Sequence, residues 1–188
     1  MKGLFMRTNK DEAMHYATAS EIEILNRFKG NIIKAYAVYD KKFLNKKVIY
    51  KTQKRTVVLV CRKSNFMHLC GIDYYNNNNG RFFSDCKRGT LNFKRNCVKI
   101  KNDGNTYRKL QVIGCLGDLL IQDKARLVGN TIKIFSSYDY ILRSSAAVIG
   151  LGCSWDGKRY FPKSILNLKY EHLVAGEKIE KILIENLI

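Results

Sequence analysis

The chain has 188 residues, of which 46% are hydrophobic and one is proline. This composition excludes an intrinsically disordered chain and fits a folded domain with a core of its own. Lys and Arg outnumber Asp and Glu by 34 to 16, which gives a formal net charge of +18 and favours a polyanionic partner.

The first predicted elements are helices in residues 11–39. Apolar residues recur in this segment near the 3.6-residue period of an α-helix. Ser20 and Glu23 have the spacing of a capping box, and Gly30 is expected to divide the segment into two helices.

The next predicted elements are a β-hairpin and two short helices. Residues 46–52 and 55–61 are rich in β-branched side chains and lie two residues apart, which is typical of a hairpin. Ser64 is expected to cap the short helix that follows. After the polar loop at 76–79, a second short helix is expected at about 80–87.

The second half of the chain changes from helix to strand. Residues 97–101 predict a strand, and residues 106–120 predict a helix with one apolar face. Asp156 and Gly157 mark a hairpin turn further on, whereas the final ten residues fit either strand or helix. The later segments with strand character are 126–128, 131–136, 146–153, 164–170 and 178–188.

Helices followed by an antiparallel sheet make α+β the expected fold class. We expect a single domain over residues 1–188, with 1–40 as its N-terminal helical part, because the length fits one domain and no linker interrupts it.

Basic residues are concentrated in two segments. Residues 41–72 contain nine Lys or Arg and no acid, and residues 81–101 contain seven, with Asp85 as the one acid. A single basic run is often only a solvated face, but two such runs favour a phosphate-binding surface. The residues expected to bind a nucleic-acid backbone are Lys54, Arg55, Arg81, Lys87, Arg88, Lys158 and Arg159.

A candidate catalytic cluster follows the second strand of the first hairpin. Arg62 and Lys63 come at the end of that strand, and His68 lies six residues after Arg62. RNA cleavage needs cations and proton carriers around the scissile phosphate, and histidine carries protons near neutral pH. The alternative is a core histidine, because Met67 and Leu69 flank His68.

A second candidate surface lies in residues 154–164. Cationic and aromatic side chains alternate around the predicted turn, as in a stacking platform beside phosphate ligands. The alternative is an ordinary exposed hairpin with a solvated tip. The residues concerned are Lys158, Arg159, Tyr160, Lys163 and Ser164.

The sequence favours chemistry without a metal ion or a cofactor. A two-metal nuclease needs several converging carboxylates, yet residues 41–155 contain six Asp, no Glu and no close acidic pair. The six cysteines form no CxxC pair, so a structural zinc site is not expected. Metal-free cleavage uses the 2′-hydroxyl of the substrate as the nucleophile, which indicates RNA.

The start of the chain lacks the apolar segment of a signal peptide, so we expect a cytoplasmic protein with reduced thiols. No stretch approaches the length of a membrane span, and no basic amphipathic helix predicts binding to a membrane surface. A membrane is therefore not an expected partner.

Three stretches carry a resemblance to a known family: 57–72 with its core His68-Leu69-Cys70-Gly71, 82–91, and 138–166 with Pro162-Lys163-Ser164. In these stretches the chain resembles the PBECR group of phage-associated nucleases, within the barnase, EndoU, colicin E5/D and RelE superfamily, and it is most similar to the fourth subfamily. The resemblance implies helices before an antiparallel sheet, metal-free RNA cleavage, and a toxin role in phage conflict or in a toxin–antitoxin pair.

Three functional hypotheses remain open, and the third is a phage or host interaction protein whose partner is an acidic protein that mimics nucleic acid. The first two use the basic surface on nucleic acid itself. In the first, the protein is an endoribonuclease toxin whose partners are RNA and an antitoxin, either an RNA or an acidic protein. His68 then handles a proton, while Tyr160 or Ser164 orients the substrate, and the scissile phosphate is held by Arg62, Lys63 and Lys163. In the second, a non-catalytic nucleic-acid-binding protein uses the same basic surface.

Overall fold

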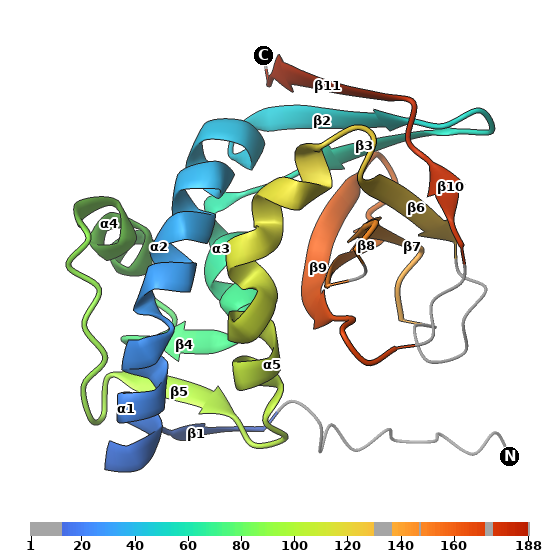
Figure 1. Ribbon diagram of the computed structural model, residues 1–188. Helices are drawn as coiled ribbons and strands as arrows, with labels where there is room; N and C mark the ends of the chain where they lie inside the picture. The colour runs from blue at the N-terminus through green and yellow to red at the C-terminus, as the bar shows by residue number, and fades with distance from the viewer. Residues whose placement is uncertain (1–12, 130–136, 147, 172–174, 188) are drawn as a thin grey trace, which may run out of the picture.

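The computed structural model describes residues 13–129, 137–146, 148–171 and 175–187. They form an α+β fold in which a group of helices stands beside a large twisted sheet (Figure 1), so the expected fold class is confirmed. The helical elements are α1 (Ala19–Arg27), α2 (Lys29–Val38), the π-helical turn η2 (Tyr39–Phe43), α3 (Lys63–Cys70), α4 (Asn79–Arg88), α5 (Asn105–Val112) and the 3-10 helix η3 (Ile113–Leu120).

The strands fall into a small sheet and a large one. The small sheet has the order β1-β5-β4, and the large one has the order β10-β6-β7-β8-β9-β3-β2-β11. The strands are β1 (Met14–Tyr16), β2 (Lys46–Lys51), β3 (Thr56–Val60), β4 (Ile72–Tyr74), β5 (Val98–Lys101), β6 (Ala125–Gly129), β7 (Tyr140–Ser144), β8 (Ile149–Trp155), β9 (Tyr160–Asn167), β10 (Glu177–Lys178) and β11 (Lys181–Asn186). The predicted strand at 131–136 lies outside the described residues.

The capping box of α1 consists of Thr18 and Glu21, so the prediction of Ser20 and Glu23 is wrong. The Thr18 side chain accepts a hydrogen bond from the Glu21 N–H, and the Glu21 carboxylate accepts one from the Thr18 N–H. Thr18 is the last extended residue after β1, and an N-cap needs that extended backbone. Ser20 already lies inside the helix.

Two further helix boundaries differ from prediction. α1 and α2 meet at Phe28, two residues before Gly30. α3 begins at Lys63 with Arg62 as its N-cap, so Ser64 is a helical residue and not the cap. The Asn65 side chain accepts a hydrogen bond from the Arg62 N–H at 2.7 Å and fixes this end of the helix.

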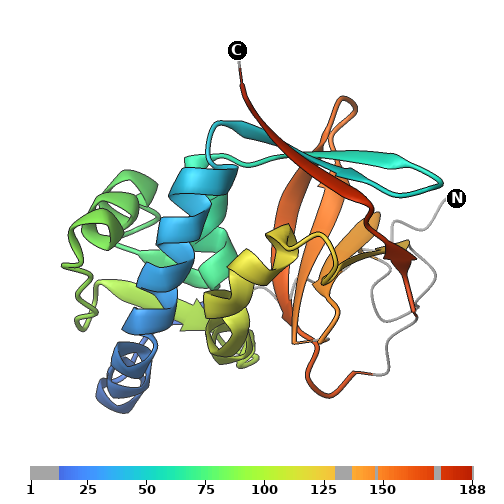
Figure 2. The same ribbon diagram turned by 45° about the horizontal axis from the view of Figure 1, so that its top comes forward.

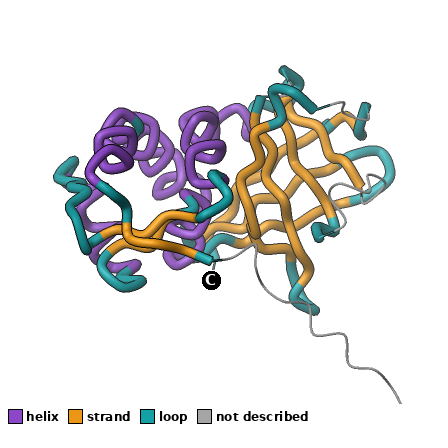
Figure 3. Tube along the Cα trace, turned by 90° about the horizontal axis from the view of Figure 1, so that it is seen from below, coloured by secondary structure: helices purple, strands orange, loops and turns teal. Residues whose placement is uncertain are grey.

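The large sheet curls until its two edges approach each other. β10 pairs with β6 at one edge and β11 pairs with β2 at the other, yet only Ile179 and Glu180 separate the two strands in sequence. An ion pair at 2.9 Å between Arg55, in the β2–β3 turn, and Glu177 joins the same edges. The strands at the top of Figure 1 therefore run across the direction of β8 and β9, and Figure 3 shows the helices beside this curled sheet.

The helices pack on the sheet through one hydrophobic core. Phe66 of α3 contacts aromatic rings of α2, η2 and α4, with ring centroids 4.9 Å apart for Tyr39 and 5.8 Å apart for Phe82. The same core includes Leu59 of β3 and Leu151 of β8. η3 lies between α2 and the strands β6 to β8 (Figure 2).

β9 is the strand that contacts both α3 and α5. It pairs with β8 along its length, but its register with β3 holds a single pair, Leu59 with Tyr160. Beyond that pair, α3 and α5 pack against β9 in the place where a strand would lie. None of the described helices is both long enough and apolar enough to cross a membrane.

Candidate nucleic-acid interface

His68 lies on the exposed face of α3. Ser64 and His68 are four residues apart, which places them on the same stripe of the helix, and both are exposed. Met67 and Leu69 point the other way, with 2% and 1% of their surfaces exposed. The sequence left a buried His68 open as an alternative, and the structure places this histidine at the surface.

The C-terminal end of α3 is joined to α5 by a close packing contact. Gly71 ends the helix with a φ of 70°, and a Cβ atom there would lie 2.9 Å from the Lys109 Cδ. The Thr106 hydroxyl donates a hydrogen bond to the Gly71 carbonyl at 2.5 Å, and the Lys109 ammonium donates one to the His68 carbonyl at 3.4 Å. A glycine is needed here both for its backbone conformation and for this contact.

Lys109 is the buried cation of this junction, with 6% of its surface exposed. Burial, and after it the nearby positive charge of Lys101, lower the pKa of Lys109 to about 8. Cys70 and Asp103 act in the opposite direction and raise it. The amine therefore titrates close to neutral pH, which few lysines do.

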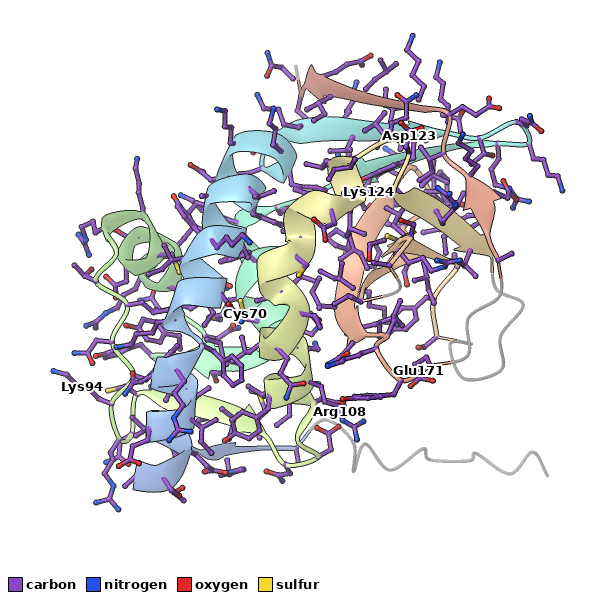
Figure 4. The ribbon with its side chains drawn as sticks, viewed as in Figure 1. Cys70, Lys94, Arg108, Asp123, Lys124 and Glu171 are labelled. Carbon is purple, nitrogen blue, oxygen red and sulfur yellow. The ribbon has the colours of Figure 1, made fainter. Side chains whose placement is uncertain are left out.

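Lys109 lines a pocket of about 250 Å³ between α5 and the second half of β9. Lys101 and Arg108 bring positive charge to it, and Glu171 brings the one carboxylate of its lining. Arg108 lies in the first turn of α5, and Glu171 lies beyond the end of β9 (Figure 4). The other residues of this pocket, called the α5 pocket below, are Asn105, Tyr138, Ser164, Ile165, Leu166 and Asn167.

A second pocket, of about 300 Å³, lies at the other end of α3 and is called the α3 pocket below. Arg62 and Arg159 supply its positive charge, and Asp156 pairs with Arg159 at 3.6 Å. The remaining residues of its lining are Val60, Ser64, Asn65 and Phe161. Ser64, near the start of α3, lines the α3 pocket, and Lys109 of the α5 pocket contacts the last turn of α3. The two pockets therefore adjoin opposite ends of this helix.

Of the six predicted catalytic residues, Arg62 lines the α3 pocket and Ser164 the α5 pocket. Lys163 is exposed beside the α5 pocket, where its ammonium donates a hydrogen bond to the Ser137 carbonyl at 3.0 Å. Lys63 points elsewhere, toward α4, with its ammonium 5.2 Å from the centroid of the Phe83 ring.

Tyr160 belongs to an aromatic cluster on the β8–β9 hairpin. Its ring centroid lies 4.9 Å from that of Trp155 and 5.2 Å from that of Tyr140. Trp155 is 49% exposed, so its ring offers a face to which a base can stack. Lys158 is exposed at the tip of this hairpin.

The remaining predicted binding residues lie away from both pockets. Arg81 and Arg88 form ion pairs with Asp85 at 3.7 Å and 2.7 Å. Arg55 pairs with Glu177, and Lys54 stands nearby in the β2–β3 turn. Lys87 lines a third pocket, together with Lys63. The structure therefore divides the predicted basic surface among several faces.

Sequence reasoning did not find Lys109, Arg108 or Trp155. A signal for Lys109 was present, because it lies four residues before Ile113 and seven before Leu116, on the apolar stripe of the predicted helix. The ammonium of a lysine at such a position must either extend to the solvent or lie in a buried site where polar groups bind it. No comparable signal marks Arg108 or Trp155.

The comparison with known families identifies the family of this chain. A family model described as phage-Barnase-EndoU-ColicinE5/D-RelE like nuclease4 (PBECR4) matches residues 31–184, which include His68 and all residues of both pockets. No curated protein and no solved structure matches the chain. The described residues contain no group of three or more His, Cys, Asp or Glu side chains that could hold a metal ion. The chain belongs to the PBECR4 family of phage-associated nucleases.

Proposed function

We propose that the protein is a metal-independent endoribonuclease that binds RNA across the face formed by α3, α5 and β9. One observation carries this proposal. The His68–Gly71 segment of α3 packs against Lys109, and Lys109 and Ser164 of β9 line one pocket in which cations outnumber carboxylates. His68 is exposed on the last turn of α3, whose backbone contacts Lys109. A phosphate in this pocket contacts positive charge and proton carriers together, as its cleavage requires.

The pair of pockets favours a polymeric substrate. A regular strand rises about 3.3 Å per residue, so Phe161 in the α3 pocket and Ile165 in the α5 pocket lie at most about 13 Å apart along β9, which has a β-bulge between Pro162 and Ser164. A short stretch of single-stranded RNA covers this distance. Arg62 and Arg159 then hold a phosphate that flanks the scissile one, and Trp155 stacks on a base nearby.

The reaction follows from the groups around the α5 pocket. The 2′-oxygen of the ribose attacks phosphorus, His68 accepts the proton of that hydroxyl, and the bond from phosphorus to the 5′-oxygen breaks. Arg108 and Lys101 stabilise the extra negative charge of the phosphorane. The products are a 2′,3′-cyclic phosphate and a 5′-hydroxyl.

Incubation of the purified protein with end-labelled RNA in EDTA tests this function. We expect cleavage with a 2′,3′-cyclic phosphate at the new end, and no cleavage of RNA that carries a single 2′-deoxyribose at the cut site. RNA that is bound but remains intact in the presence and in the absence of EDTA would support the non-catalytic nucleic-acid-binding alternative instead.

The role of His68 is tested by His68→Ala. We expect kcat/KM to fall by a factor of about 10² to 10⁴, the usual contribution of one proton carrier. His15→Ala is the matched control, because His15 lies on β1, where it pairs with Glu21 at 3.1 Å, and it should leave the rate unchanged. An undiminished rate for His68→Ala removes this histidine from the mechanism.

The same proposal extends to a cytoplasmic toxin role, in phage defence or in a toxin–antitoxin system. Such an enzyme requires an inhibitor, and the net charge of +18 favours an acidic protein or a structured RNA. Expression of the chain alone should arrest growth, whereas co-expression with the inhibitor should restore it. Normal growth with active protein in the cell contradicts the toxin role and leaves the nuclease activity standing.

A further inference from the structure

We propose that Lys109 is the general acid of this reaction and donates a proton to the 5′-oxygen as it leaves phosphorus. This inference rests on the proposed endoribonuclease function and assigns the second proton transfer that the function needs. Sequence reasoning gave no role to Lys109, because its position on α5 suggests helix packing alone.

The geometry around the Lys109 ammonium supports this role. Its one recorded hydrogen bond, to the His68 carbonyl, is long at 3.4 Å, and no described carboxylate lies within ion-pair distance of it. The side chain is packed against Gly71, which fixes its direction, and it lines the α5 pocket with Ser164. The ammonium thus has N–H bonds left for a ligand in that pocket.

The charges that face Lys109 make it able to release a proton. Burial and Lys101 of β5 lower its pKa to about 8, against the effect of Cys70 on α3 and Asp103 before α5. Arg108 of α5 and Glu171 beyond β9 face the same pocket with opposite charges. A lysine with this pKa is mostly protonated at pH 7 and is still a far stronger acid than an ordinary lysine.

The proton and electron balance closes without a further reactant. The 2′-oxygen forms its bond to phosphorus as His68 takes the 2′-hydroxyl proton, and the electron pair of the breaking bond passes to the 5′-oxygen. Lys109 gives that oxygen its proton and becomes a neutral amine. Exchange of protons with water then returns His68 and Lys109 to their starting states.

The experiment uses two variants and two substrates. Lys109→Arg keeps a positive charge but cannot release a proton near neutral pH, and Lys109→Met removes the charge at similar volume. The second substrate is RNA with sulfur in place of the bridging 5′-oxygen at the cut site, since a thiolate leaves without a proton. Lys124→Met is the control, because Lys124 is exposed and lies at the opposite end of the α5–η3 segment from Arg108 (Figure 4).

With ordinary RNA, we expect both Lys109 variants to lose a factor of about 10² to 10⁴ in kcat and to bind uncleavable 2′-deoxy RNA normally. With the sulfur substrate, their rates should return to within a few-fold of wild type. The wild-type rate on ordinary RNA should fall above pH of about 8, where Lys109 loses its proton, and the sulfur substrate should remove this fall.

Three outcomes overturn the inference. Lys109→Arg with near wild-type activity shows that charge alone suffices, and a loss that persists with the sulfur substrate shows a positioning role. If both variants fail to fold, a wild-type pH profile that is the same for both substrates excludes a proton donor with this pKa. Wild-type protein that cleaves no RNA overturns the proposed function itself, which the other outcomes leave intact.

Discussion

At the scale of single residues, Lys109 is a buried charge that destabilises the fold. Its pKa falls from 10.5 to about 8 on folding, so the folded state binds fewer protons than the unfolded state between these values. The group costs about 3 kcal/mol at pH 7, and this cost disappears as the pH rises from about 8 to 10.5. A residue kept at this cost is typical of a site whose chemistry needs it.

Lys109→Met should therefore stabilise the protein at neutral pH. We expect a gain of about 2 kcal/mol at pH 7, after about 1 kcal/mol is lost with the hydrogen bond to the His68 carbonyl. The gain should vanish by about pH 10, where Lys109 is neutral in the folded state and the remaining cost of its burial is no larger than the lost hydrogen bond. Urea unfolding of both proteins at pH 7 and pH 10 measures this, with Lys124→Met as the control. A Met variant that is less stable by the same amount at both pH values contradicts the shifted pKa.

The candidate site residues were predicted from their residue types, and the sequence does not show which other residues each of them contacts. Arg62 and Ser164 were predicted to be catalytic, and in the structure each lines a pocket, while the catalytic role stays a prediction. Arg81 and Arg88 carry the same positive charge as Arg62, but the structure shows that both form ion pairs with Asp85 of the same helix. The apolar stripe of the predicted helix marks Lys109 as unusual, but its contact with Gly71, 38 residues earlier in the chain, is visible only in the folded structure.

At the scale of elements, local patterns predicted the helices and the first hairpin because those elements have local causes. β2 and β3 alternate buried and less buried residues across a tight turn, and α4 follows a polar loop. β7 was missed, and its burial explains why: Ile141 to Ser144 are all buried, so the strand lacks alternation. The start of β9 was placed four residues late, because Pro162 breaks the strand pattern in sequence.

The ends of α3 and α4 offer a matched test of how the site is built. Both helices end at a glycine in the left-handed conformation, Gly71 with φ of 70° and Gly89 with φ of 68°. A Cβ atom would meet Lys109 at Gly71, whereas nothing lies within 4 Å of it at Gly89. An alanine at either position would therefore suffer the same backbone strain, but only an alanine at position 71 would also clash with a neighbouring side chain.

Gly89→Ala should cost about 1 to 2 kcal/mol, the penalty of the left-handed conformation, and should leave RNA cleavage unchanged. Gly71→Ala should cost about 1 to 3 kcal/mol more and lower the cleavage rate by at least tenfold, because it displaces Lys109. Thermal unfolding and cleavage assays on folded protein give both quantities. Equal effects of the two substitutions on cleavage contradict the place of Lys109 in the site.

At the scale of the whole molecule, the curled sheet and the net charge have opposing effects. The Arg55–Glu177 pair and the short link between β10 and β11 hold the two edges of the sheet near each other. The charge of +18 works against compactness, since the cations repel one another when no polyanion is bound. RNA bound as proposed on the face of α3, α5 and β9 would neutralise part of this charge and should stabilise the fold.

Sodium chloride should therefore act in opposite directions on stability and on binding. Salt screens the repulsion among the cations, so the melting temperature of the free protein should rise between 50 and 200 mM. Over the same range, affinity for uncleavable 2′-deoxy RNA should fall by a factor of about 10³ to 10⁵ if six to ten phosphates are contacted. The increase in melting temperature on adding this RNA should accordingly be large at 50 mM sodium chloride and small at 200 mM. Affinity that does not change with salt would mean that the protein does not hold its ligand through phosphates, and the proposed interface would then be wrong.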